Sequence, residues 1–381
     1  MTTPPTGPRI GSLCTGSGAL DTAVTDLIGG HLAWCADNDP HVQTLLAYRH
    51  PDTPNLGDIT LTDWSEVPPV DAIVGGFPCQ DISNAGPREG LDGARSRLWW
   101  TVHAAVRNLR PRIVYLENVS ALRGRGLDIV IGSLAAIGYD AAWTCVRASD
   151  AGATHRRDRW FCVAVPADDP VPFARRDTGT PPRVHDSRGL KLLPTPTSAD
   201  GTGGPGVSAK RAGGMNLRTA VLTLPDPADC PMFPTPKASD GPNGGPNQRD
   251  GAGRYYLPGH VVNVLPDPEG VPQPLAGGFS PEAWWHAVDG TDYTPTIRRW
   301  ETITGHTAPP PTLPSPRGGR RLSPWFVEWM MGALPGLICA VPGIPRAQQL
   351  KIGGNGAVTL QAYMAYAALM DELATADLEA A

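Results

Sequence analysis

The chain has 381 residues, of which 41% are hydrophobic, so it is long enough for two domains with buried cores. Its net charge of −5 argues only mildly against DNA binding, because phosphate contacts need a local basic face and not a basic whole. Seven cysteines without a CxxC pair argue against a disulfide framework and a zinc site. The sequence shows no long apolar run and no signal peptide, so we expect a cytoplasmic protein.

The first predicted strand, residues 9–13, runs into a glycine-rich turn that contains Gly16 and Gly18, and a helix is predicted from near Leu20. A glycine turn that leads into a helix amino terminus lets the backbone approach a cofactor closely. Asp37 lies just past the second predicted strand, residues 31–36. An acidic residue about twenty positions beyond such a turn can bind ribose hydroxyls.

A short third strand is predicted before Gly57, and a further buried strand, residues 72–74, ends in two glycines, Pro78 and Cys79. A thiol at this place is unusual, although a small buried core cysteine is the simpler interpretation. Another apolar strand, residues 113–116, ends in Glu117. If these strands are parallel neighbours, the glycine turn, the thiol and the carboxylate share one site at the carboxyl edge of the sheet.

The last predicted strands of this region are residues 138–146 and 160–165. Arg157 and Arg159 stand just before the second of them. Alternation along a strand predicts that both arginines lie on one face, and a solvated charge run is the alternative.

A proline-rich segment follows, since 27 of the 42 prolines lie between residues 166 and 316. Regular helix is therefore not expected there. Residues 192–201 recur as residues 232–241, offset by 40 positions, and each copy is followed by an apolar run. Two interpretations are open: an irregular domain of loops on short strands, which we favour, and a disordered linker.

These motifs together resemble the DNA cytosine-5 methyltransferase family. The resemblance rests on residues 77–80 (Phe-Pro-Cys-Gln), residues 117–119 (Glu-Asn-Val), the arginines before the last strand, residues 320–323 and residues 354–358. It implies an α/β fold: a Rossmann-like, S-adenosylmethionine-dependent catalytic domain with a mostly parallel sheet, plus a smaller, irregular target-recognition domain. We expect the catalytic domain at 1–166 and 350–381, and the recognition domain at 167–349.

The resemblance also implies the site residues. Cys79 is the expected nucleophile, Glu117 holds the cytosine, Arg159 contacts its O2, and Arg157 orients the thiol side or a phosphate. The expected S-adenosylmethionine contacts are Cys14, Thr15, Gly16, Ser17, Gly18, Ala19, Asp37, Asn38, Asp58, Ile59, Gly76, Pro78, Asn355 and Ala357. The expected DNA contacts are Gln80, Ser83, Arg97, Lys210, Arg211, Lys237, Arg249 and Arg320.

In such an enzyme the thiolate adds to C6 of a flipped-out cytosine and activates C5 for methylation. We expect double-stranded DNA as the substrate, a monomer, no metal, and a role in restriction protection with or without a cognate restriction enzyme. Two alternatives remain open, RNA methylation by the same chemistry and a DNA-binding module without activity. The sequence departs from the family pattern at Cys14, Ala19 and Phe326, where an aromatic residue, a glycine and a glutamate are usual.

Overall fold

The computed structural model describes residues 6–77, 97–169, 171–173, 231–242, 244–266, 280–316, 318 and 320–380. Within these residues six strands form one sheet in the order β2-β1-β3-β4-β6-β5. The strands are β1 (Arg9–Leu13), β2 (His31–Ala36), β3 (Ala72–Gly76), β4 (Ile113–Val119), β5 (Tyr139–Arg147) and β6 (Asp158–Pro166). β1 to β4 pair in parallel, and β6 runs antiparallel between β4 and β5. The predicted α/β class with a mostly parallel sheet is confirmed.

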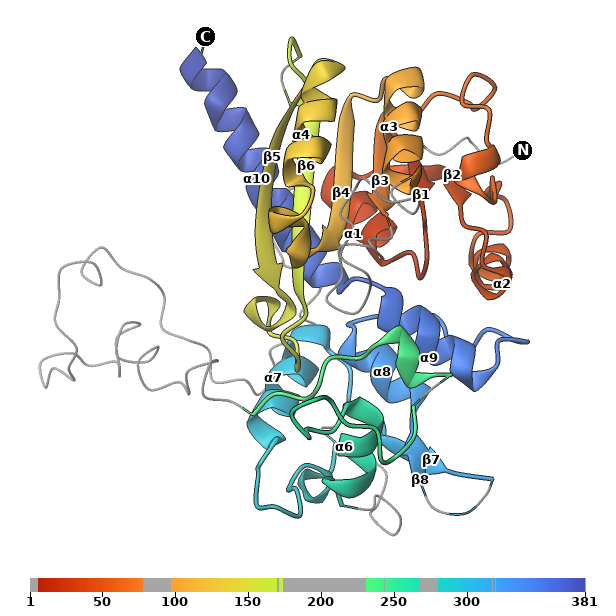
Figure 1. Cartoon of the computed structure of the whole chain (residues 1–381), viewed down its shortest axis with the longest axis vertical. Helices are drawn as coiled ribbons and strands as arrows, with labels where there is room; N and C mark the ends of the chain where they lie inside the picture. The colour runs from red at the N-terminus through yellow and green to blue at the C-terminus, as the bar shows by residue number, and fades with distance from the viewer. Residues whose placement is uncertain are drawn as a thin grey trace, which may run out of the picture.

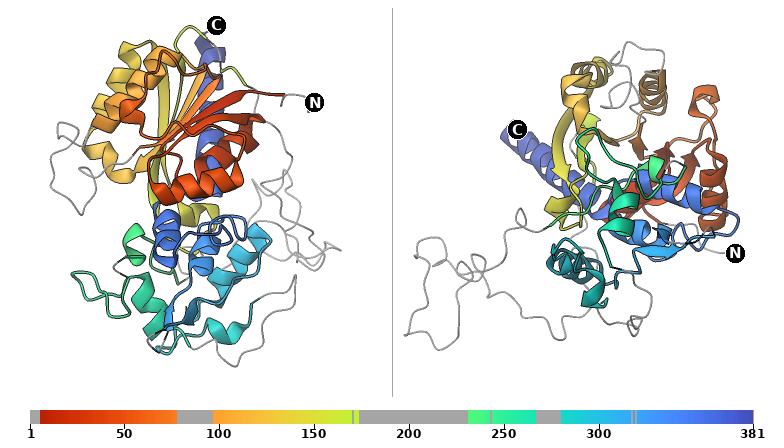
Figure 2. Two further views of the ribbon diagram at one scale, coloured as in Figure 1. Left: turned by 90° about the vertical axis from the view of Figure 1, so that its right-hand side faces the viewer. Right: turned by 60° about the horizontal axis from the view of Figure 1, so that its bottom comes forward.

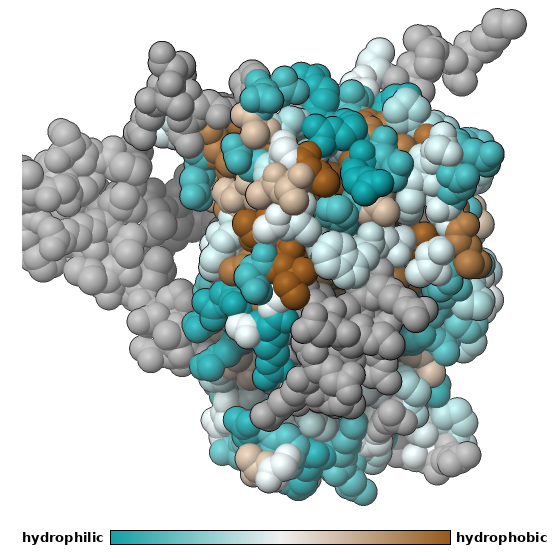
Figure 3. Space-filling model, turned by 45° about the horizontal axis from the view of Figure 1, so that its top comes forward, coloured by the Kyte–Doolittle hydropathy of each residue, from teal (hydrophilic) through white to brown (hydrophobic). Residues whose placement is uncertain are grey.

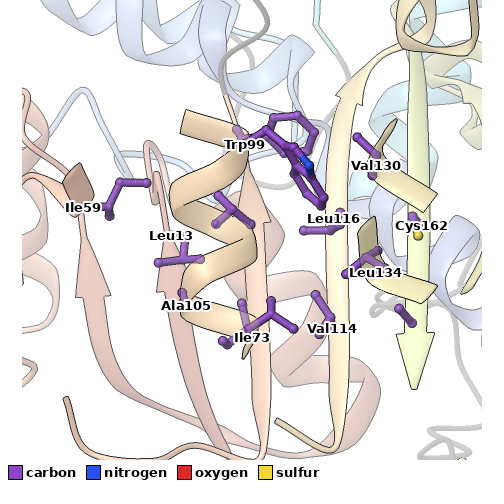
Figure 4. Close-up of a cluster of buried hydrophobic side chains, with 14 of the residues drawn as sticks. Leu13, Ile59, Ile73, Trp99, Ala105, Val114, Leu116, Val130, Leu134 and Cys162 are labelled. Carbon is purple, nitrogen blue, oxygen red and sulfur yellow. The ribbon is translucent and has the colours of Figure 1, made fainter. Parts of the chain in front are cut away.

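Helices cover both faces of this sheet (Figure 2). The helices are α1 (Ala19–Ile28), α2 (Pro40–Arg49), α3 (Arg97–Leu109), α4 (Leu127–Ala136) and α10 (Thr359–Ala380). On one face, α3 and α4 pack Trp99, Val130 and Leu134 against β-strand residues such as Val114 and Leu116 (Figure 4). On the other face, α1 and α10 bury their apolar sides. The result is the three-layer arrangement that positions ligands at the carboxyl ends of the parallel strands.

A second group of elements lies below the sheet in the view of Figure 1. It contains α6 (Leu257–Asn263), α7 (Thr294–Thr304), α8 (Pro324–Met330), α9 (Arg346–Asn355), β7 (Thr312–Pro314) and β8 (Arg320–Leu322). Its core is rich in aromatic side chains: Phe233, Trp284, Trp285, Trp300, Phe326 and Trp329. The ring of Phe326 stacks at 5.9 Å from that of Trp285 and 5.7 Å from that of Trp329. An aromatic core of this kind stabilises a small body with few strands.

The expectation that regular helix is absent between residues 166 and 316 was wrong. Both α6 and α7 lie in this range, and each has a proline, Pro258 or Pro295, in its first turn. Proline is tolerated there because the first-turn amides have no partner within the helix and its fixed φ suits a helix start. Proline content therefore marked helix starts as well as loops.

The described part of the chain also has no strand directly before Gly57, where a short one was predicted. Asn55 makes an isolated parallel bridge to Cys35, and the next element is a 3-10 turn, Ile59–Leu61. Further 3-10 turns within the described residues are Ser120–Gly124, Ala148–Ala151, Ala238–Asp240 and Glu282–Trp284.

Helix α2 contributes to the junction between the two groups of elements. Val42, Leu45 and Leu46 pack against Ile338 and Val341 beyond α8. At the end of α2, Arg49 donates from Nε to the Leu337 carbonyl at 3.0 Å, and at its start the Asp39 carboxylate lies 2.6 Å from Lys351 Nζ. These contacts fix the lower group against the edge of the sheet that carries the site described below.

The face drawn in Figure 3 mixes polar side chains with small separate groups of apolar ones. Exposed large apolar residues among those described include Tyr48, Trp100 and Trp143, which lie on different elements. No helix in the described part of the chain has the length and apolar character needed to cross a membrane.

Candidate active site

A cavity of about 550 Å³ opens at the carboxyl ends of β1, β2, β3 and β4. Its volume lies within the range of about 300–1,000 Å³ that is usual for small-molecule sites. Twelve of the predicted cofactor residues line it: Cys14, Thr15, Gly16, Ser17, Ala19, Asp37, Asn38, Asp58, Ile59, Gly76, Asn355 and Ala357. Gly18 does not line it, but ends the turn as the residue before α1, and Pro78 lies outside the described residues.

The glycine turn owes its shape to left-handed backbone at Gly16 and Gly18, with φ of 58° and 76°. The Asp37 carboxylate accepts a hydrogen bond from the Gly16 amide at 2.9 Å and another from the Asp39 amide at 3.0 Å. Burial raises the pKa of Asp37, while these two amides oppose the rise. Asp37 thus holds the turn in place in addition to facing the cavity.

Cys14 occupies the turn position where the family usually has an aromatic residue. It too has a positive φ, 53°, which is uncommon for a side chain other than glycine. Burial raises the pKa of its thiol to about 12, so the group is neutral at physiological pH. A small uncharged thiol therefore replaces a ring in the cavity wall.

Asn38 and Asp58 meet at another side of the cavity. The Asn38 side-chain amide donates to Asp58 Oδ2 at 3.0 Å, and Asp58 also accepts from the amide and hydroxyl of Thr60. The bonds from Thr60 lower the pKa of Asp58, so it is a fixed acceptor. Ile59, next in the chain, is buried and lines the same wall.

Glu117 and Arg159 form an ion pair on the cavity wall. Arg159 Nε lies 2.8 Å from Glu117 Oε1, and the two side chains are only 18% and 14% exposed. Burial raises the pKa of Glu117, although the guanidinium groups of Arg159 and Arg157 act against the rise. A Cβ on Gly76 would lie 3.2 Å from Glu117 Oε2, so the glycine leaves room for the carboxylate.

Arg157 is not where alternation along the strand placed it. β6 begins at Asp158, and Arg157 precedes it with a positive φ of 30°, so the alternation of the strand does not extend to its side chain. Its guanidinium is buried and donates to the carbonyls of Pro236, Gly354 and Asn355 at 3.2, 3.0 and 3.2 Å, and also to that of Gly356. These contacts fix Arg157 within the protein, and its expected role at the thiol or a phosphate stays a prediction because Cys79 lies outside the described residues.

Two predicted DNA-binding residues make stacking contacts. Lys237 Nζ lies 4.0 Å from the centre of the Tyr256 ring, and the Arg249 guanidinium lies 3.6 Å from that of Tyr255. Arg249 also donates to the Gly253 carbonyl at 2.7 Å. Its side chain is exposed on this tight hairpin.

Arg320, the third described candidate for DNA contact, makes contacts within the protein, and its expected role at DNA stays a prediction. Its guanidinium donates to the carbonyls of Val262, Leu265 and Pro266, at 2.6, 3.3 and 2.8 Å, around the end of α6. Arg97 begins α3, but its side chain is outside the described part of the chain. Cys79, Gln80, Ser83, Lys210 and Arg211 lie outside the described residues, so their expected roles remain predictions.

Sequence reasoning missed several residues of the site. Asn118 is 2% exposed and donates to the Phe77 carbonyl at 3.1 Å, directly before the segment that carries Cys79. Its signal was present, since Asn118 belongs to the quoted Glu-Asn-Val motif. Gly354 and Gly356 also line the cavity, and their signal was present too, since they flank Asn355 in the quoted segment 354–358. Lys351 lines the cavity as well, but it lies outside that segment and no local pattern predicts its place.

Comparison with known proteins agrees with this geometry. Residues 9–193 match the family model of the C-5 cytosine-specific DNA methylase. The Type II methyltransferase M.CviJI of Paramecium bursaria Chlorella virus IL3A is 38% identical over 128 residues, 33% of this chain and 35% of that protein. The Type II methyltransferase M.DsaV of Dactylococcopsis salina is 31% identical over 140 residues, 36% of this chain and 40% of that protein. These matches therefore span well under half of each relative.

Two solved structures share the overall fold. The Entamoeba histolytica methyltransferase EhMeth has a TM-score of 0.53 at 12% identity, over 97% of this chain and 99% of that one. The S. pombe Dnmt2 methyltransferase has a TM-score of 0.50 at 13% identity, over 96% and 99%. The fold is thus the α/β, Rossmann-like fold of these two structures, and residues 9–193 of the chain are similar to the C-5 cytosine-specific DNA methylase family.

Proposed function

We propose that this protein is a DNA (cytosine-5-)-methyltransferase that modifies a flipped-out cytosine within a specific double-stranded sequence. The observation that carries the proposal is the Glu117–Arg159 pair, set 2.8 Å apart on the wall of a cavity that also holds the glycine turn. One end of the site suits a nucleoside and the other suits a flat polar ring. That combination fits a cofactor and a base that react with each other.

The cavity fits S-adenosylmethionine on the chemistry of its lining. Asp37 and Asp58 offer carboxylate acceptors for ribose hydroxyls and an adenine amino group, and Ile59 offers an apolar surface for the ring. Gly356 lets the backbone lie close against the turn, since a Cβ there would lie only 2.7 Å from Ser17 Oγ. When bound, the cofactor supplies an electrophilic methyl group to C5 of the base.

The residues of this chain activate the base. The Cys79 thiolate adds to C6 and makes C5 nucleophilic. Glu117, whose pKa is raised by burial, donates a proton to N3 of the ring as the adduct forms. Arg159 stabilises the negative charge that develops on O2. After methylation a base, such as a water molecule, removes the C5 proton, the electron pair reforms the double bond, and Cys79 leaves.

Two functional regions follow from this proposal. Residues 1–166 and 350–381 form the catalytic region, and residues 167–349 form the target-recognition region; α9, Arg346–Asn355, spans the second boundary. Because the relatives are named Type II methyltransferases, we propose a role in restriction and modification. The enzyme would act as a monomer, with or without a cognate restriction enzyme.

Transfer of a labelled methyl group tests the proposal against its alternatives. The purified protein is incubated with labelled S-adenosylmethionine and either duplex DNA or structured RNA of the same sequence. The proposal requires the labelled methyl group to appear on C5 of cytosine in the DNA. Label in RNA alone would establish RNA methylation, and DNA binding without transfer would establish a binding module.

A further inference from the structure

We infer that residues 234–241, the second copy of the sequence repeat, support the wall of the cofactor cavity and set cofactor affinity, instead of reading DNA as we predicted from the sequence. The inference rests on the proposed function, because it takes the cavity to be the S-adenosylmethionine site. Within it, Gly241 and Arg157 act as positioning residues.

The first observation is close packing of this segment on α9. A Cβ on Gly241 would lie 2.0 Å from the Ala347 carbonyl oxygen. A Cβ on Gly354, near the end of the same helix, would lie 2.2 Å from the Lys237 carbonyl carbon and 2.4 Å from the Ala238 nitrogen. The backbones of the two segments therefore touch at two points, each of which leaves no room for a side chain.

The opposite side of the same helix end faces the cofactor cavity. Gly354, Asn355 and Gly356 line the cavity. Gly356 lies against the glycine turn, where an added Cβ would be 2.7 Å from Ser17 Oγ. The end of α9 is thus held between residues 234–241 and the turn that we assign to the cofactor. Any shift of the segment moves a wall of the cavity.

Arg157 ties these parts together. Its Nη1 atom donates to the Pro236 carbonyl at 3.2 Å, and its Nη2 atom donates to the Gly354 carbonyl at 3.0 Å. Only 4% of the residue is exposed, so these bonds form away from solvent, where leaving a charged donor without partners is costly. One buried guanidinium therefore fixes the repeat segment and the cavity wall at the same time.

The sequence shared by the two repeat copies matches this docking role. In the described copy, Asp240 accepts from the Lys237 amide at 2.8 Å and is 1% exposed, while Pro236 and Gly241 make the contacts above. The sequence of the other copy has proline, aspartate and glycine at the corresponding places. Lys237, which stacks on Tyr256, is replaced there by threonine. The shared residues are the docking ones, whereas the candidate reader differs.

The test is Gly241→Ala, with Gly245→Ala as its matched control. Gly241 has φ of −77°, which alanine adopts without strain, so the substitution acts only through the contact with Ala347. A Cβ on Gly245 would meet nothing within 4 Å. Calorimetry with S-adenosylhomocysteine and no DNA should show the dissociation constant rising by about tenfold or more in Gly241→Ala, which is about 1.4 kcal/mol, and unchanged in Gly245→Ala.

Bisulfite sequencing of DNA methylated by both variants should return the wild-type target sequence. The inference is overturned if the Gly241→Ala protein keeps wild-type cofactor affinity, whether or not its target sequence changes. The proposed function stands in either case. Failure of the wild-type protein to bind S-adenosylhomocysteine contradicts the proposed function itself, and the inference with it.

A measurement on the wild-type protein decides the matter if Gly241→Ala does not fold. Hydrogen exchange is followed with and without S-adenosylhomocysteine. Because a bound ligand stabilises the wall that holds it, exchange at the amides of Lys237, Asp240 and Gly241 should slow. Slower exchange at the glycine turn alone, with these amides unchanged, overturns the inference.

Discussion

Arg159 Nε lies 2.8 Å from Glu117 Oε1, and the two residues come from antiparallel neighbours, β6 and β4. In that register Arg159 stands opposite Val119, two positions along β4 from Glu117, so both side chains project from the same face of the sheet. The pair gives the site a buried acid whose proton affinity is raised and a cation that limits the rise.

Replacing the acid should separate catalysis from binding. We expect Glu117→Gln to lower kcat by at least about 100-fold, because an amide cannot donate the proton that the N3 atom requires. Cofactor affinity should be unchanged, since the contacts assigned to the cofactor remain. Steady-state kinetics and calorimetry check this, with the exposed Glu66→Gln as the control. A Glu117→Gln enzyme with wild-type kcat would remove Glu117 from the chemistry.

Cys79→Ser should abolish methylation while DNA and cofactor binding persist. A serine hydroxyl is far less nucleophilic than a cysteine thiolate at neutral pH. Methyl transfer is measured beside DNA binding by gel shift, and Cys145→Ser serves as a matched control at a free thiol on β5. Retained turnover in Cys79→Ser would refute the covalent mechanism.

Asp37→Ala should weaken cofactor binding and leave DNA affinity nearly unchanged. The change removes a carboxylate from the cavity and also the acceptor for the Gly16 amide, so the glycine turn loses its brace. A loss of about 1–3 kcal/mol is expected for a charge-assisted contact of this kind. Calorimetry measures it, and equal cofactor affinities in Asp37→Ala and wild type would exclude Asp37 from the site.

The hairpin that carries Arg249 should contribute to target choice. The guanidinium is held by the Tyr255 ring and the Gly253 carbonyl, which orders it before DNA arrives. If it reads a guanine, Arg249→Ala should cost about 1–3 kcal/mol of discrimination at one base pair. Methylation of a library of variant sites measures this, with the exposed Arg107→Ala on α3 as the control. Uniform weakening across all sequences would mean a phosphate contact instead.

A buried carboxyl in α1 should make stability depend on pH. Asp21 is 4% exposed, and burial raises its pKa to about 7. The folded state therefore keeps a proton that the unfolded chain releases at its ordinary pKa near 3.8. Stability should fall as pH rises from about 4 to about 7, by a few kcal/mol at most.

Asp21→Asn should remove this dependence and raise the unfolding free energy at pH 7. Urea unfolding at a series of pH values measures it, with the exposed Asp52→Asn as the control. Parallel pH profiles for wild type and Asp21→Asn would show that Asp21 ionises normally in the folded protein.

Local patterns in the sequence predicted the sheet and the glycine turn well. Strand ends that carry Gly16, Asp37 and Glu117 were recognisable because apolar runs and the residues that end them are local features. Arg157 was misplaced because alternation was extended one residue beyond β6, to a position with positive φ. The contacts of Arg320 could not be predicted, because its partners lie more than 50 positions earlier in the chain, at the end of α6. Contacts of this range depend on tertiary packing, which neither spacing nor composition encodes.

The central claim is that this protein methylates C5 of cytosine in a specific duplex sequence. Bisulfite sequencing of DNA from cells that produce the protein tests it most directly, with cells producing Glu117→Gln as the reference. The account predicts protected cytosines within one short recurring sequence in the wild-type sample, and none above background in the reference. Equal protection in the two samples, or no protected cytosine in either, would contradict it.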